Sequence, residues 1–231
     1  MYDTLLVDTL TQYVAAAAGL GTAAFALVDS TKSVFGGTSN YGYFAIKRTV
    51  RQFLPADPKT PKKSTPAVLG FESLRSSLRA NWLNGTPLEQ QKAIAKAQIK
   101  LRLNDSTVTA YANITKVDAN TLTEIAKKIA SGDPLDPKQN NEWSRFDFIL
   151  TSILDECYAR ADQHYRNFSK ATAVVVSVCL ALLGQSVYPP SFGGYAVAFL
   201  VGLAATPVAP IAKDLTSALS SAVKTAQSLR K

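Results

Sequence analysis

The sequence is poor in the residue types that build redox and metal centres. In 231 residues it has two cysteines, Cys157 and Cys179, and one histidine, His164. The cysteines have no paired spacing and no second histidine completes a ligand set, so neither a disulfide framework nor a zinc site is expected. A di-metal helical bundle would need Glu-x-x-His pairs, and Ala161 stands three residues before His164. The sequence predicts no metal and no cofactor.

Motifs for nucleotide binding and nucleophilic catalysis are also missing. Gly19-Leu20-Gly21 lacks the third glycine and the preceding strand of a dinucleotide site, and no P-loop pattern occurs. Glu156 and Arg160 have the spacing of an i,i+4 surface pair. His164 lies on an apolar helical stripe, where packing is expected rather than a ligand or switch role. The sequence therefore predicts no enzymatic activity.

Charge is missing from residues 171–212. These 42 residues contain no Asp, Glu, Lys, Arg or His, although 18% of the whole chain is charged. A bilayer core of about 30 Å takes about 20 helical residues, so the stretch is too long for one crossing. Tyr188-Pro189-Pro190-Ser191 and Gly193-Gly194 form a helix-breaking turn near its middle. The stretch predicts a transmembrane hairpin made of residues 168–187 and 192–211.

A third uncharged segment lies near the N-terminus, between Asp8 and Asp29. A signal peptide would begin with a basic region and end in a small-residue cleavage site. Here the first charges are acidic, and the first basic residue is Lys32. We therefore expect a retained membrane anchor. The predicted fold class is all-α: an integral membrane protein with three transmembrane helices and a small helical cytoplasmic domain.

The distribution of basic residues predicts the orientation in the membrane. With the N-terminus outside, three crossings place residues 30–167 and 212–231 inside, and all 25 Lys and Arg then lie on that side or at its boundary. The positive-inside rule demands this asymmetry. It accounts for the net charge of +8 without nucleic acid as a partner. We expect a bacterial cytoplasmic (inner) membrane location, with the lipid bilayer as partner and the C-terminus cytoplasmic.

Small residues recur every four positions along each predicted crossing. This spacing lets helix backbones approach closely, although alanine-rich apolar helices also produce such stripes by chance. It favours a tight bundle, a homo-oligomer or a subunit of a membrane complex. The predicted transmembrane packing residues are Gly19, Ala23, Ala173, Ser177, Ala181, Gly194, Ala198 and Gly202.

A basic amphipathic helix is predicted soon after the first crossing. Its apolar face holds Tyr43, Ile46, Val50, Phe53 and Leu54. Beside that face lie Lys47, Arg48 and Arg51, which are candidate anionic-lipid contacts if the helix lies on the inner membrane surface. The alternative is a helix packed on the domain core with its basic face in water. The proline-rich segment that follows, residues 55–66, predicts a linker.

Helical spacing predicts several helices in the middle of the chain. We expect one at 71–83, one opened by a capping box at Thr86 to Glu89 and running to about Leu103, and two more at about 106–114 and 120–130. A turn-rich break is predicted at 131–141. One long helix should then enter the membrane, with a stripe of Trp143, Phe146, Leu150, Ile153, Leu154, Cys157, Ala161, Tyr165 and Phe168.

These expectations divide the chain into six segments. They are an N-terminal transmembrane helix (1–30), a basic amphipathic segment with a proline-rich linker (31–66), a helical cytoplasmic domain (67–138), a long helix entering the membrane (139–187), a turn with the third crossing (188–212), and an amphipathic C-terminal helix (213–231).

The layout resembles a group of uncharacterised bacterial membrane proteins. Their shared features are an N-terminal crossing, a helical cytoplasmic stretch, an R…WYxR-like entry to a crossing, and a last helix that begins at glycine and ends in proline plus DLL. The corresponding residues here are Arg160, Tyr165-Arg166, Gly194, Pro207 and Asp214-Leu215. His164 replaces the tryptophan, and the group's Asn-x-Asp after the second crossing is missing. The resemblance covers about the last third of the chain and implies no activity.

The expected function is a non-enzymatic inner-membrane scaffold or anchor that oligomerises or joins a larger membrane complex. The alternative is an oligomeric pore or channel, or a pore former like the colicins, which hide an apolar hairpin in a water-soluble bundle. Ion-coupled transport is disfavoured because no Asp, Glu, Lys, Arg or His lies in the interior of the predicted crossings; Lys170 lies at the entry of the second.

Overall fold

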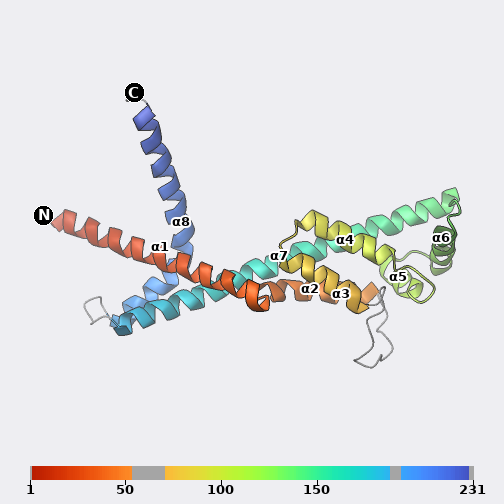
Figure 1. Cartoon of the computed structure of the whole chain (residues 1–231), viewed down its shortest axis with the longest axis horizontal. Helices are drawn as coiled ribbons and strands as arrows, with labels where there is room; N and C mark the ends of the chain where they lie inside the picture. The colour runs from red at the N-terminus through yellow and green to blue at the C-terminus, as the bar shows by residue number, and fades with distance from the viewer. Residues whose placement is uncertain (1, 54–70, 188–193, 229–231) are drawn as a thin grey trace. The chain divides into compact units, whose positions relative to one another are not determined.

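A computed structural model of the chain describes residues 2–53, 71–187 and 194–228, with side chains for 12–31, 36–53, 71–187 and 194–211. These residues form eight helices and no strand (Figure 1). The helices are α1 (Tyr2–Phe35), α2 (Ser39–Phe53), α3 (Phe71–Leu83), α4 (Leu88–Lys100), α5 (Val108–Thr115), α6 (Ala119–Ser131), α7 (Pro137–Val187) and α8 (Gly194–Ser228). The all-α prediction is confirmed for this part of the chain.

Three of these helices are long and apolar enough to cross a membrane. The candidate spans are Gln12–Thr31 in α1, helix α7, and Gly194–Ile211 in α8. Helix α7 has 51 residues, or about 77 Å at 1.5 Å per residue, which exceeds twice the thickness of a bilayer core. Only its uncharged C-terminal part suits lipid. The predicted number of crossings agrees with this, and the chain has the character of a membrane protein.

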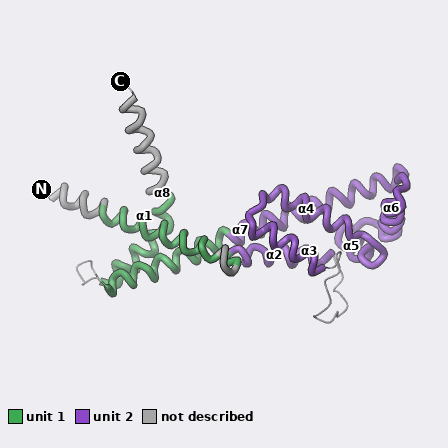
Figure 2. The backbone as a smooth tube through the Cα atoms, viewed as in Figure 1, with its two compact units in different colours: residues 1–38, 166–231 green, residues 39–165 purple. Residues whose placement is uncertain are grey.

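The chain divides into two compact units, shown in Figure 2. Unit 1 comprises residues 1–38 and 166–231, and unit 2 comprises residues 39–165. Helix α7 contributes residues to both, because it is unbroken from Pro137 to Val187. The sequence predicted this continuity, since residues 139–183 contain neither glycine nor proline.

Aromatic side chains fill the core of unit 2. Phe146 of α7 is fully buried and stacks on Tyr111 of α5, with ring centroids 6.0 Å apart. Phe53 of α2 meets the same tyrosine edge-on at 5.7 Å. The predicted apolar stripe of α7 is buried or half-buried as far as Tyr165. It ends there, because Phe168 is 42% exposed.

The ends of two helices differ from the predictions. No side chain caps α4: its N-cap is Pro87, and Thr86 Oγ1 instead lies 3.4 Å from Asn81 Oδ1, so the predicted capping box is wrong. Helix α7 begins at Pro137, inside the predicted break. Proline suits a first helical turn because the amide hydrogen that it lacks has no partner there. The bounds of α3 match the prediction.

Two lysines of α4 hold the Asp147 carboxylate of α7. Lys96 Nζ lies 2.6 Å from Asp147 Oδ2, and Lys100 pairs with the other oxygen. Partial burial alone raises the pKa of the Asp147 carboxyl, but the hydrogen bonds from Lys100 and Lys96 outweigh it and leave this pKa below its usual value. A carboxyl group whose pKa is lower in the folded state stabilises the fold at pH values above its unfolded-state pKa. This stabilisation is lost as the pH falls through the folded-state pKa.

Replacing Asp147 by asparagine should therefore destabilise unit 2 at neutral pH but not in acid. We expect the free energy of unfolding to fall by about 1–2 kcal/mol at pH 7. The difference from wild type should shrink as the pH falls below about 4 and disappear below the folded-state pKa of Asp147. Urea unfolding followed by tryptophan fluorescence measures this, since both tryptophans, Trp82 and Trp143, lie in unit 2. Asp155→Asn, which breaks a more exposed pair with Lys92, serves as the control. A difference that persists in acid would contradict the ion-pair explanation.

Candidate functional site

Helix α1 packs on α8 through a glycine at close range. A Cβ atom added to Gly21 would overlap the carbonyl oxygen of Ala205 and lie 2.7 Å from Ala209 Cβ. Ala17, Ala24 and Val28 are buried on the same side of α1. Because the contact at Gly21 involves backbone, no side-chain rotation could make room for a larger residue.

The predicted packing residues of α1 lie on its other side. Gly19 and Ala23 are exposed, and a Cβ atom at Gly19 would meet nothing within 4 Å. Gly19 and Gly21 are separated by about 200° around the helix, so one residue faces away when the other is in contact. Within the described chain, Gly21 rather than Gly19 or Ala23 contacts α8, and packing of Gly19 and Ala23 against another helix stays a prediction.

Helix α7 packs on α8 through the predicted residues. A Cβ atom at Gly202 would lie 2.6 Å from Val178 Cα. Ser177 Oγ donates a hydrogen bond of 2.7 Å to the Gly202 carbonyl and lies 3.4 Å from Thr206 Oγ1. Such a bond satisfies both polar groups inside the hydrocarbon of a bilayer, where no water is available as a partner.

The remaining predicted positions on these two helices fall into two groups. Ala173, Ser177, Ala181 and Gly202 are buried, whereas Gly194 and Ala198 are half-buried. Ala173 also packs with Ala24 and Val28 of α1, so that all three candidate spans are in contact.

The apolar face of α2 is covered by unit 2. Tyr43, Ile46, Val50 and Phe53 are buried in its core, while Leu54 lies outside the described residues. Trp82 of α3 donates a hydrogen bond of 2.8 Å to the Ser39 carbonyl at the start of α2. Of the two predicted placements, the structure has the helix packed on the domain core. Its apolar face is not free to enter a bilayer.

The basic side chains of α2 remain at the surface. Arg48 and Arg51 are exposed and Lys47 is half-buried. Beside them, Phe44 is 66% exposed although it is a large apolar residue. Electrostatic contact with an anionic surface stays a prediction for these three cations, but insertion of the buried face would first require the core of unit 2 to open.

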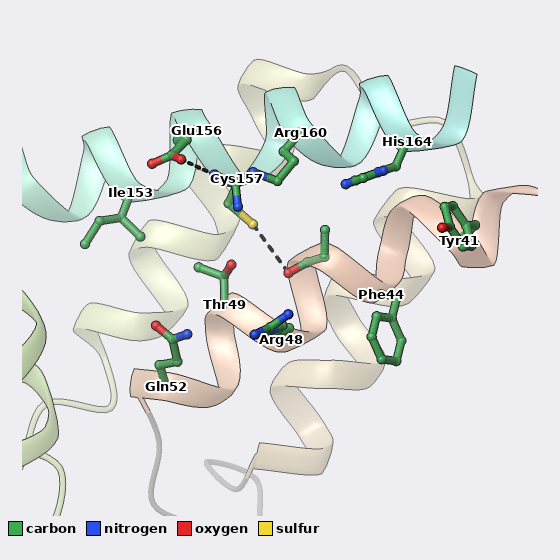
Figure 3. Close-up of a pocket in the computed structure, with 11 residues that line it drawn as sticks. Tyr41, Phe44, Arg48, Thr49, Gln52, Ile153, Glu156, Cys157, Arg160 and His164 are labelled. Atoms are coloured by element: carbon green, nitrogen blue, oxygen red, sulfur yellow. Dashed lines mark hydrogen bonds and ion pairs between the residues drawn. The ribbon is translucent and has the colours of Figure 1, made fainter. Parts of the chain in front are cut away.

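A groove lies between α2 and α7, with a cavity volume of about 570 Å³ (Figure 3). Arg48 comes from α2, while Arg160 and His164 come from α7. Arg160 forms an ion pair with Glu156, as the i,i+4 spacing predicted. The His164 ring meets the Tyr41 ring edge-on, with centroids 5.9 Å apart. His164 thus packs on Tyr41, while its side chain remains exposed.

The floor of the groove includes a buried thiol. Cys157 Sγ lies 3.8 Å from the Ala45 carbonyl oxygen, to which it donates. Burial raises the pKa of the Cys157 thiol, and a protonated thiol is a poor nucleophile. This residue therefore contributes packing to the site rather than covalent chemistry.

Within the side chains that the structure describes, no group of three or more His, Cys, Asp or Glu could hold a metal ion. No family model, curated protein or solved structure matches the chain.

Proposed function

We propose that the protein is a non-enzymatic scaffold or anchor of the bacterial inner membrane, with its N-terminus outside and unit 2 in the cytoplasm. It associates with copies of itself or with a larger membrane complex through its spans. Three close-packed candidate spans and a helical unit with its own core support a protein built to hold a domain at a membrane.

The exposed small-residue face of α1 is the observation that carries this proposal. Ala15, Gly19, Ala23 and Ala26 are all exposed on the side opposite Gly21. In the apolar stretches of the candidate spans, the buried share is 22% in α1, 17% in α7 and 28% in α8. Most of their surface is therefore available to lipid or to other helices. Small residues allow a second helix to approach the α1 backbone closely, which is how helices associate in lipid.

Native mass spectrometry of the full chain in mild detergent tests the association. We expect an oligomer or a complex with a partner, and we expect Gly19→Leu to dissociate it by at least tenfold in apparent affinity, because leucine holds the backbones apart. Gly184→Leu is the matched control, since Gly184 is also exposed and a Cβ there would meet nothing within 4 Å. An isolated, partnerless wild-type monomer would contradict the proposal.

A further inference from the structure

The exposed side of α2 concentrates positive charge. The helix contains no acidic residue, and Lys47, Arg48 and Arg51 lie within two turns. Six ion pairs in the described part of the chain join acids to cations other than these three. A second hollow of about 440 Å³ is lined by these three cations with Phe44 and Gln52, and it shares Phe44, Arg48 and Gln52 with the groove. This surface attracts an anion.

Helix α7 supplies an arginine from the other wall of the groove. Arg48 and Arg160 both line the cavity, 112 residues apart in the sequence (Figure 3). A guanidinium group binds phosphate oxygens in pairs, and two such groups match one phosphodiester. Thr49 and Gln52 add polar side chains, and Ala45 and Ile153 add apolar surface. The volume of the groove is within the range of small-ligand sites.

Position along α7 indicates where the anion would come from. Arg160 lies eight residues, or about 12 Å along the helix, before residue 168, where the second crossing is predicted to start. The polar region of a bilayer leaflet is about 5–8 Å thick, so the Arg160 backbone lies a few ångströms beyond it. The long arginine side chain covers this distance to the headgroups. Tyr41 and Phe44, at the rim of the groove, are 53% and 66% exposed, and aromatic side chains favour this interface. Each basic residue near an anionic membrane surface adds to the attraction.

We propose that the groove between α2 and α7 binds the phosphate headgroup of an anionic phospholipid. Arg48 and Arg160 bind the phosphate, Lys47 and Arg51 add long-range attraction, and Phe44 lies against the lipid's glycerol and ester region. Glu156 competes with the phosphate for Arg160. The inference rests on the membrane placement in the proposed function, but it does not depend on association with a partner.

Lipid binding to the full chain tests this assignment. The detergent-purified, delipidated protein is titrated with phosphatidylglycerol or with phosphatidylethanolamine, and bound lipids are counted by native mass spectrometry. We expect Arg48→Gln with Arg160→Gln to weaken phosphatidylglycerol binding at least tenfold. Phosphatidylethanolamine should bind more weakly to the wild type and lose less, because its ammonium group offsets the phosphate charge. Glu156→Gln should strengthen phosphatidylglycerol binding about threefold, because the competing carboxylate is removed. A general disturbance of the fold would not produce this opposite effect.

The control removes the same charge elsewhere in unit 2. Lys127→Gln with Arg145→Gln changes two exposed cations that do not line the groove, and binding should stay within twofold of wild type. Equal losses in both double variants would overturn the site in favour of general electrostatic attraction. Full displacement of the lipid by 10 mM inorganic phosphate, on the order of the concentrations at which weak anion sites fill, would assign the groove to free phosphate instead. A monomer that still binds phosphatidylglycerol selectively would refute the association while leaving the lipid site intact.

Discussion

Replacing Gly21 by leucine is expected to separate α1 from α8 and to abolish the packed fold of unit 1. The new side chain would have to occupy space held by the Ala205 carbonyl and the Ala209 methyl group. Overpacking against side chains costs about 1–3 kcal/mol, and a backbone neighbour cannot move aside by changing rotamer. We expect a loss of more than about 3 kcal/mol, which exceeds the effect of most single substitutions.

A buried reporter thiol measures the effect. Ala173→Cys, at a fully buried position where α7 contacts α1, is introduced together with Cys179→Ser, and its reaction with a membrane-permeant maleimide is followed. The thiol should be protected in this parent and react at least tenfold faster when Gly21→Leu is added. Gly19→Leu is the control on the same helix: it should leave the thiol protected even though it weakens association. Equal protection in both variants would show that α1 and α8 do not meet at Gly21.

The pattern of α1 explains why its contact with α8 at Gly21 was not predicted. Residues 15–19 are four alanines and a glycine, so small residues face every direction and the four-residue spacing fits two opposite stripes equally well. In α7 and α8, large residues such as Val175, Leu183 and Leu200 separate the small ones, and there the predicted Ser177 and Gly202 do meet. Spacing identifies a face only where the other faces differ in size or polarity.

Helix α2 shows a different limit of sequence reasoning. Its buried residues were predicted correctly, because a period of 3.6 defines a face whatever covers it. The pattern could not distinguish lipid from protein as the covering material, since both favour the same apolar residues. The cover comes from segments distant in sequence, including Trp82 and Tyr111. The placement of Arg48 and Arg160 along one groove is non-local for the same reason, and no spacing rule connects them.

Replacing Phe146 by alanine should produce the largest loss of stability in unit 2. The side chain is fully buried and its ring stacks on two others, Tyr111 and Trp143, the second with centroids 5.1 Å apart. Tyr111 in turn donates a hydrogen bond of 2.7 Å to the Ile99 carbonyl, so the cavity would open between α4, α5 and α7. A phenylalanine truncated in a core costs about 3–5 kcal/mol.

Phe148 provides the matched control, because it has the same side chain two positions further along α7. It is 72% exposed, and about 200° of helical rotation separates it from Phe146. Urea unfolding midpoints from tryptophan fluorescence should give Phe148→Ala within about 0.5 kcal/mol of wild type. The midpoint is the observable to compare, since removing the ring stacked on Trp143 changes the fluorescence amplitude by itself. Losses of similar size in the two variants would mean that the stripe through Phe146 does not form the core of unit 2.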